Sequence, residues 1–295
     1  RVSVETPATP GPATPREPLE RGAKIPGPVA IGVDAKRFFN LTRTLAVTEF
    51  KLRFFGSALG YLWQLMRPLL LFGVLYVVFT QVLKFNSDSV FYPVALLSGV
   101  VIFTFLSECT TTAVTSLVDR EPLVRKVQFP RLVIPLSVVA TGLMNLALNT
   151  VVVVIFLLIS GGSVLLTWLE IPFILVLLAL FSASISTLLS ALYVRYRDVR
   201  PVWDVVLQMM FYGTPIFYTI DVINNTTIER LMLVNPLAAL IQQFRHAVID
   251  HSHPSIVEAG GGWLFVLAPA GVLTLLVVVS YRYFNREAPR IAEDL

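Results

Sequence analysis

Long apolar runs alternate with short charged connections along most of the chain. Six runs lie at about residues 62–83, 93–118, 132–159, 171–194, 204–219 and 263–283. A bilayer core takes about 20 predominantly apolar residues per helical span. The runs are continuous rather than alternating with a period of two, which favours helices over a β-barrel. The pattern therefore predicts an all-α, polytopic membrane protein with six transmembrane helices.

A different pattern precedes the first run, over residues 36–60. Apolar residues recur there at helical spacing, at Phe38, Leu41, Leu45, Leu52, Phe55 and Leu59. Polar residues fall roughly opposite, at Asn40, Arg43, Thr44 and Lys51. Such a stripe predicts an amphipathic helix that lies flat in the membrane surface. The stripe is imperfect, because Val47 lies among the polar positions and Glu49 lies near the apolar ones.

The two ends of the chain have no such pattern. Residues 1 to about 35 contain seven of the 19 prolines, with Thr, Ala and Gly between them. This composition buries too little apolar surface to offset the entropy of ordering the chain. We therefore predict a disordered cytosolic tail over 1–35 and a short cytosolic tail over 287–295. No charged, apolar and small-residue series opens the chain, so we expect no cleavable signal peptide.

Composition and charge strengthen the membrane interpretation and orient the chain. Only 14% of the residues are charged and 55% are hydrophobic, whereas soluble domains carry about 25% charged residues. With both termini cytosolic, the inside segments from residue 36 onward hold fifteen Lys and Arg and the outside segments hold three. An excess of basic residues marks cytosolic loops. The count favours an even number of spans with both ends in the cytosol.

Several kinds of chemistry are absent from the sequence. No G-x-x-x-x-G-K-[ST] sequence occurs, so the chain lacks a Walker phosphate loop and we do not expect it to be an ATPase. The single cysteine, Cys109, rules out an internal disulfide framework. His246, His251 and His253 cluster beside Asp250, but no fourth convincing ligand accompanies them. We expect no bound metal.

Two charges and an aromatic series lie inside the predicted spans. Arg67 can snorkel to the cytosolic headgroups or face a path for an anionic substrate. Glu108 lies deeper and needs a partner or a wet cavity, for a structural hydrogen bond or for a role in transport. The series "MMFYGTPIFYT" near residues 209–219 fits either an aromatic belt at the outer interface or the wall of a conduit.

Two connections between spans carry more pattern than a turn needs. Residues 119–135, "DREPLVRKVQFPRLVIP", hold six charges and three prolines, and they predict a brief basic helix on the cytosolic surface. That helix can attract lipid headgroups or dock a cytosolic partner. Residues 226–249 form two apolar pieces, each too short to span, separated at Asn235 and Pro236. They fit two short helices that dip into the outer leaflet, or amphipathic helices on its surface.

Five sequence pieces, taken in order, resemble the membrane subunit of ABC-2 type polysaccharide exporters. They are "LGYLWQLMRPLL", "PLVRKVQFPRLVIPLS", "YRDV", "TPIFY" and "NPLAALIQQFR". The family includes exporters of O-antigen, teichoic acid, capsule and actinobacterial galactan. The resemblance covers roughly residues 37–286. Within it, 61–286 is expected to be the transmembrane domain, and about 221–262 its re-entrant region.

The resemblance also implies partners and a substrate. The expected assembly is a homodimer in the bacterial plasma membrane with two copies of a separate cytosolic ATPase, which would bind ATP and Mg. This chain itself would need no cofactor and would bind no nucleic acid. The expected cargo is a polyprenyl-diphosphate-linked polysaccharide. Arg outnumbers Lys eighteen to five, which with the Pro, Thr and Ala tail favours an actinobacterial galactan. The alternative is an ABC-2 permease for lipid or small-molecule efflux.

The resemblance assigns three groups of residues. The substrate path would be lined by Tyr61, Trp63, Arg67, Tyr212, Phe217 and Tyr218. The coupling helix, about 121–129, would contact the ATPase through Glu121, Pro122, Leu123, Arg125, Lys126, Phe129 and Arg131. The 36–60 helix becomes an interface helix, with Arg43, Lys51 and Arg53 near the headgroup of the incoming lipid-linked substrate.

Overall fold

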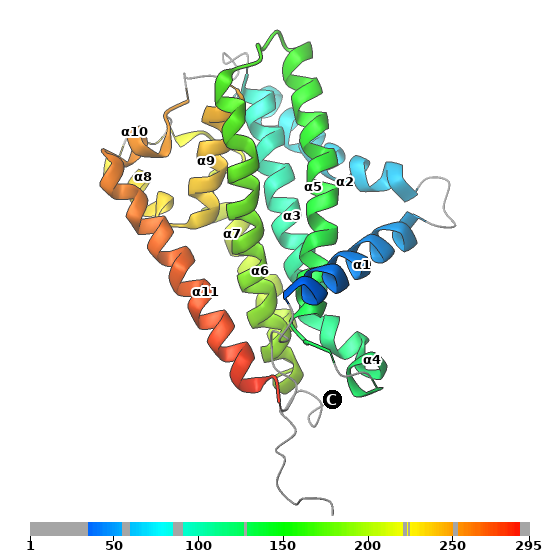
Figure 1. Cartoon of the computed structure of the whole chain (residues 1–295). Coiled ribbons are helices and arrows are strands. Elements are labelled where there is room, and N and C mark those ends of the chain that lie inside the picture. Colours follow the sequence, from blue (N-terminus) through cyan, green and yellow to red (C-terminus); the bar gives the residue numbers. More distant parts are fainter. Residues whose placement is uncertain are drawn as a thin grey trace, which may run out of the picture.

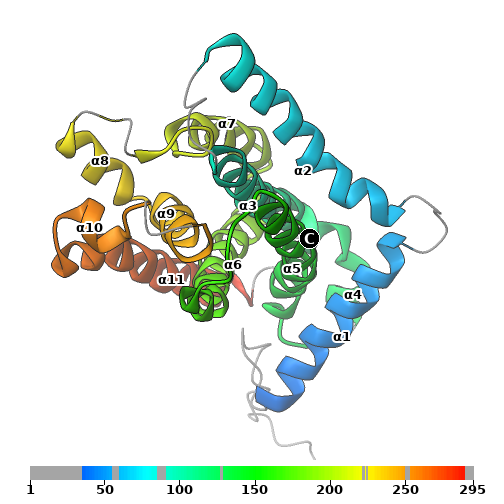
Figure 2. The ribbon, with the colours of Figure 1, turned by 90° about the horizontal axis from the view of Figure 1, so that it is seen from above.

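Three long helices form the centre of the molecule. The computed structural model describes residues 35–54, 60–84, 91–126, 129–220, 223, 225–249 and 253–289. Within these ranges all regular secondary structure is helical. The central helices α3 (Tyr92–Asp119), α5 (Val133–Ile159) and α6 (Ile171–Arg195) pack side by side, and α11 (Leu267–Glu287) leans against α6 (Figures 1 and 2).

Five helical segments in the described ranges are long and apolar enough to cross a membrane. They are Leu62–Val82, Tyr92–Asp119, Val133–Ile159, Leu166–Arg195 and Trp263–Glu287. In the most apolar stretch of the first segment 6% of the residues are buried, and in that of the second segment 78% are buried. The α3 helix is covered because α2, α5, α6 and α7 all pack around it. The first span is the opposite case, because one side of it packs on the core through Leu69, Phe72 and Leu75 while Leu62, Leu70 and Val74 stay exposed.

The first two helices lie outside the central bundle. They are α1 (Ala35–Phe54) and α2 (Gly60–Tyr76), and η1 (Val77–Val82) continues α2 as a π-helix. Both helices run across α3 and α5 rather than along them (Figures 1 and 2). The predicted amphipathic helix is present over its described residues, Ala35–Phe54. Ala46 is fully buried against α5, whereas Leu52 on the predicted apolar stripe is 66% exposed. Phe55 and Leu59 lie outside the described residues.

The fifth apolar run forms a shorter helix than predicted. The α7 helix (Val199–Gly213) has 15 residues, so it is not among the five long segments, and the expected helix through residue 219 is wrong at that end. Thr214 has φ −103° and ψ 144°, an extended conformation. A residue before proline is disfavoured in the helical region, and Pro215 follows it. The chain therefore leaves the helix while it is still apolar.

Short helices follow α7 at the end of the bundle opposite α4. They are α8 (Thr226–Leu233), α9 (Pro236–Val248), α10 (Ile256–Gly260) and η4 (Trp263–Val266) (Figure 1). The break predicted at Asn235 and Pro236 is confirmed. The Asn235 side chain accepts a hydrogen bond of 3.0 Å from the Leu237 amide, and Pro236 occupies the first helical position.

The other end of the bundle carries the predicted basic connection. The α4 helix (Glu121–Lys126) lies there, near the C-terminal end of α11 (Figure 1). Of the expected helix, about 121–129, the structure describes Glu121–Lys126 as helical and Phe129 as not helical. On the opposite side, η2 (Leu166–Glu170) leads into α6.

Candidate functional site

Aromatic side chains gather where α7 ends. Phe211 and Tyr212 lie with their ring centroids 5.4 Å apart, and Phe217 and Tyr218 lie 5.1 Å apart. The Tyr212 and Phe217 rings, 6.3 Å apart, join the two pairs. Phe79 of η1 stacks on Phe217 at 5.0 Å. We call these five residues the aromatic group. Their π faces can stack on other planar or apolar surfaces, and Tyr212 is 62% exposed.

A buried arginine, which we call the Arg245 clamp, holds the backbone of the aromatic group. Arg245 of α9 is 1% exposed and donates hydrogen bonds to the carbonyl oxygens of Ile216 (2.7 Å), Tyr218 (3.1 Å) and Ala95 (3.2 Å). The Tyr92 hydroxyl donates to the Phe217 carbonyl at 2.7 Å. Residues 214–219 are not helical, so their carbonyls need donors from elsewhere. The α3 and α9 helices thereby fix the non-helical segment and the rings that it carries.

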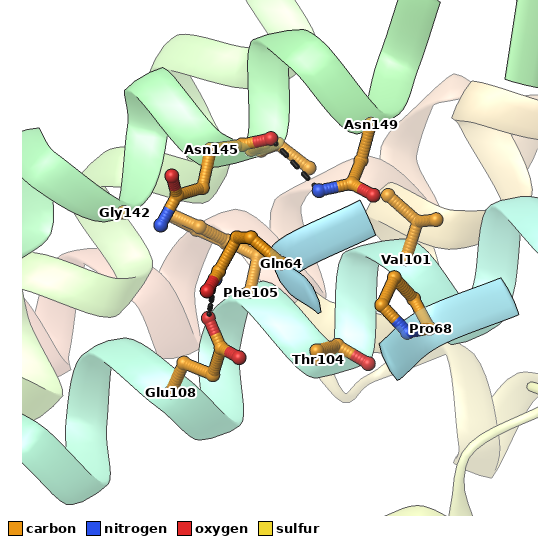
Figure 3. A pocket seen from close by; sticks show the side chains of 10 residues that line it. Gln64, Pro68, Val101, Thr104, Phe105, Glu108, Gly142, Asn145 and Asn149 are labelled. Atoms are coloured by element: carbon orange, nitrogen blue, oxygen red, sulfur yellow. Dashed lines mark hydrogen bonds between the residues drawn. The ribbon is translucent and has the colours of Figure 1, made fainter. Parts of the chain in front are cut away.

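A second polar contact joins α2 to α3. The Gln64 amide donates to Glu108 Oε2 at 2.8 Å (Figure 3). An Arg67 guanidinium nitrogen donates to Glu108 Oε1 at 3.3 Å. We call these three residues the polar seam. The Arg67 side chain is 74% exposed and that of Glu108 is 20% exposed. The carboxylate therefore has the partner that its depth in α3 required, and Arg67 pairs within the protein.

A small cavity adjoins the polar seam. It is about 10 Å³ in volume, and Gln64, Glu108, Thr104, Asn145 and Asn149 lie around it (Figure 3). This volume suits about one water molecule. The Asn149 amide donates to the Asn145 carbonyl at 2.9 Å, but neither polar atom of the Asn145 side-chain amide forms a hydrogen bond within the described part of the chain. A water molecule here would supply the missing partners.

At the other end of the bundle, an ion pair joins α1 to the start of α4. Glu49 of α1 pairs with Arg120, which also donates to the Ser137 hydroxyl of α5 at 3.1 Å. Burial lowers the pKa of the Arg120 guanidinium from its ordinary value. Thr141 of α5 donates to the Ala46 carbonyl at 3.2 Å. Glu49 thus interrupts the apolar stripe of α1 because it pairs with the half-buried Arg120.

The α4 helix presents one face to the bundle and one away from it. Val124 is buried in a cluster with Leu117 of α3 and Ile134 of α5, and Phe129 packs against the same cluster. Pro122 and Leu123 are exposed, and Glu121 is half-buried. The side chains of Arg125 and Lys126 lie outside the described residues.

Arg131 is buried rather than exposed for docking. It donates to the carbonyl of Ala288, directly after α11. The residues expected for coupling therefore divide into an exposed tip and an anchored base.

The polar face of α1 carries the expected basic residues. Arg43 and Lys51 are exposed and border an open hollow of about 580 Å³, which Asn40, Thr44 and Thr48 also line. The side chain of Arg53 lies outside the described residues. Two cations of the three expected near the substrate headgroup thus share one surface.

The structure brings together only part of the predicted substrate path. Tyr212, Phe217 and Tyr218 form one group, while Trp63 and Arg67 lie exposed on α2. In the described residues, the ring contact between the two sides is made by Phe79 and Phe217. The side chain of Tyr61 lies outside those residues.

The clustered histidines do not form a group of metal ligands in the described part of the chain. His246 Nδ1 lies 2.7 Å from the carbonyl oxygen of His253, and no group of three potential metal ligands gathers there. Asp250 and His251 lie outside the described residues. His246 therefore forms a local contact between α9 and the connection to α10.

Arg245 and the seam residue Gln64 were absent from the predicted site. A signal for Arg245 is present, because an arginine on the apolar piece "NPLAALIQQFR" needs buried acceptors. Gln64 gives no comparable signal, since a glutamine near the start of a span also suits the headgroup region. The buried Asn145 and Asn149 are spaced four residues apart in an apolar run, which places them on one face of α5.

Comparison with known proteins gives a consistent family along most of the chain. The sequence model described as ABC-2 type transporter matches residues 40–249. An O-antigen export system permease protein RfbA of Klebsiella pneumoniae is 29% identical over 262 residues, which cover 87% of this chain and 95% of that protein. A protein of the same name from Myxococcus xanthus is 27% identical, over 88% and 96%. The chain therefore belongs to the ABC-2 type transporter family.

Proposed function

We propose that the chain is the membrane subunit of an ATP-driven exporter that moves a polyprenyl-diphosphate-linked polysaccharide out of the cytosol. The observation that carries this proposal is the likeness to permeases named for O-antigen export, which extends over 95% or more of their length. A galactan for cell-wall assembly is the cargo that we favour, from the composition of the chain.

The aromatic group supports a path for sugars. A long glycan is too large to be enclosed and released in one step, so it would be threaded through a continuous conduit. Aromatic rings can stack on the apolar faces of sugars without holding a charge. Tyr212 is exposed beside Phe217, on which Phe79 of η1 also stacks. In this proposal α2 and α7 of two copies face each other across the conduit.

The proposed assembly has six spans in each of two copies. The five long segments and α7 make up the six, both termini are cytosolic, and α8 and α9 enter the outer leaflet without crossing it. Few residues of the Leu62–Val82 segment are fully buried, and its exposed apolar side chains, among them Leu70 and Val74, are available to the second copy. Two copies of a cytosolic ATPase would supply ATP hydrolysis and would contact the exposed tip of α4.

Arg67 has a role at loading in this proposal. Its guanidinium uses one nitrogen on Glu108 and stays 74% exposed, so an anionic diphosphate can approach it. Replacing Arg67 with Ala should lower both export and the stimulation of ATP hydrolysis by substrate. Unchanged values of both would remove Arg67 from the path.

The function can be tested by depleting the protein in its host with radiolabelled sugar precursors present. Accumulation of a polyprenyl-linked galactan inside the cell is expected. Accumulation of a different lipid-linked polymer would keep the mechanism and replace the cargo. If no lipid-linked glycan accumulates, the chain is better explained as a permease for lipid or small-molecule efflux.

A further inference from the structure

An apolar slot lies between the first turns of two spanning helices. It is about 370 Å³ in volume and is bounded by α6, α9, α10 and α11. Ile174, Leu240 and Leu273, all buried, form part of its lining. Ligand pockets commonly have volumes of about 300–1,000 Å³ and mostly apolar walls. Both its size and its lining therefore suit an apolar ligand.

The polar groups beside the slot are already bonded. The Gln243 amide donates to Glu170 at 2.7 Å, and its oxygen accepts from the Ile256 amide at 3.2 Å. Ser255 and Glu258 satisfy each other in the cap of α10. A water cluster needs polar partners, and apolar cavities of this kind stay dry or take up hydrocarbon. An empty slot would leave its walls without dispersion contacts.

The position of the slot indicates which hydrocarbon is available. Its lining includes Phe173 and Leu177 of α6 and Pro269 and Leu273 of α11, so it covers the first two turns of both helices. Two turns extend about 10 Å along a helix. This length is one third of a hydrocarbon core about 30 Å thick. Phe173 and Val257, on the slot lining, are themselves exposed. Acyl chains are the surrounding medium at this depth.

We propose that this slot binds one acyl chain of a bilayer phospholipid, at the membrane face where α6 and α11 begin. In the orientation proposed above this is the outer leaflet. The site does not depend on the identity of the exported substrate. The slot also lies away from the α2 and α7 side that the proposed assembly assigns to the second copy (Figure 2). The bound acyl chain would contact α6, α11 and α9, the helix that carries Arg245.

The test uses the purified full chain, stripped of lipid in detergent and then given dioleoyl phosphatidylethanolamine. Native mass spectrometry should find about one tightly held phospholipid per chain, and the midpoint of thermal unfolding should rise with added lipid. Ala239→Leu and Ala270→Phe each place a side chain in the slot. Either variant should reduce the retained phospholipid about tenfold or more, which corresponds to about 1.4 kcal/mol of binding free energy.

A folding defect is distinguished from a filled slot by the lipid-free midpoint. A filled slot replaces the lost hydrocarbon contacts, so at least one variant should unfold at or above the wild-type temperature without lipid. The matched control is Val176→Phe, on the exposed side of α6 outside the slot, and it should retain lipid as the wild type does. Equal retention by the filled variants, or no retention by the wild type, would overturn the proposal. Retention of a polyprenyl phosphate in place of phosphatidylethanolamine would overturn the assigned occupant.

Discussion

Arg245 shows how one side chain can organise a non-helical segment in an apolar setting. It serves carbonyls on α3 and on the segment after α7, and it is almost fully buried. Replacing it with Met keeps much of its volume but removes the donors. Each carbonyl left without a donor costs about 1–3 kcal/mol. We expect a lower midpoint of thermal unfolding and a loss of export.

The control for this change is Arg230→Met on the neighbouring α8 helix. Arg230 is exposed, and surface substitutions usually change stability by no more than about 0.5 kcal/mol. A variant Arg245→Met that unfolds and exports as Arg230→Met does would show that the clamp is not needed.

The polar seam allows a double-mutant cycle. Glu108→Gln and Arg67→Gln each remove one charge, and the double variant removes both. Residues in contact show interaction energies of about 0.5–3 kcal/mol, so the double variant should be more stable than the sum of the single effects predicts. Thermal unfolding in detergent measures each corner of the cycle. Additive effects would mean that the observed pair contributes no coupling.

At the scale of elements, the Glu49–Arg120 pair connects α1 to the start of α4. Motion of α4 would reach α1 through this pair as well as α3 and α5 through the chain. Reversing either charge alone places two like charges together in a partly buried site. We expect Glu49→Arg or Arg120→Glu to lose ATP-dependent export while the ATPase still binds.

The charge-exchanged double variant provides the test of that connection. With Glu49→Arg and Arg120→Glu together the pair is restored in the opposite sense, and export should recover at least in part. Copurification of the ATPase separates a coupling defect from failed assembly. Export by the single variants at the wild-type rate would contradict the proposed connection.

The ends of the long helices could be predicted from the apolar runs. The runs 93–118 and 171–194 agree closely with α3 and α6, because charged residues and turns bound each run. The run that forms α7 gave the wrong end, since hydrophobicity continues through residue 219 while Thr214 and Pro215 stop the helix. Local backbone preference overrides hydrophobicity there.

From the sequence we could predict that certain polar side chains need a partner, but not which residue is the partner. The sequence shows that Glu108 needs a partner and that Glu49 interrupts a stripe. It does not show their partners, because these depend on the oblique orientation of α2 and on the packing of α1 against α5 (Figure 2). Arg245 was missed for the same reason. Its acceptors come from segments far from it in the sequence.

At the scale of the whole molecule, α2 and α7 both present exposed apolar side chains. Val205 and Met209 of α7 are exposed, as are Val74 and Trp63 of α2. If two copies meet there, Met209→Cys should form a cross-linked dimer in native membranes under mild oxidation. The unchanged chain should stay uncross-linked, since its one cysteine, Cys109, is buried.

A cysteine on another exposed helix face provides the comparison. Leu180 of α6 is 42% exposed, but α6 is not part of the proposed dimer face. Leu180→Cys should therefore remain monomeric on a denaturing gel. Equal cross-linking at Met209 and Leu180 would indicate random collision, and none at Met209 would exclude this face as the dimer contact.

The order of the chain adds a consequence for biosynthesis. Ile216 leaves the ribosome 29 residues before Arg245, whose guanidinium will hold its carbonyl. Lipid offers no donor to that carbonyl in the meantime. If the fifth apolar run crosses the bilayer as proposed above, we expect it to complete its insertion only after α9 has been translated. Late translation of α9 would make insertion of this half of the protein a single concerted event.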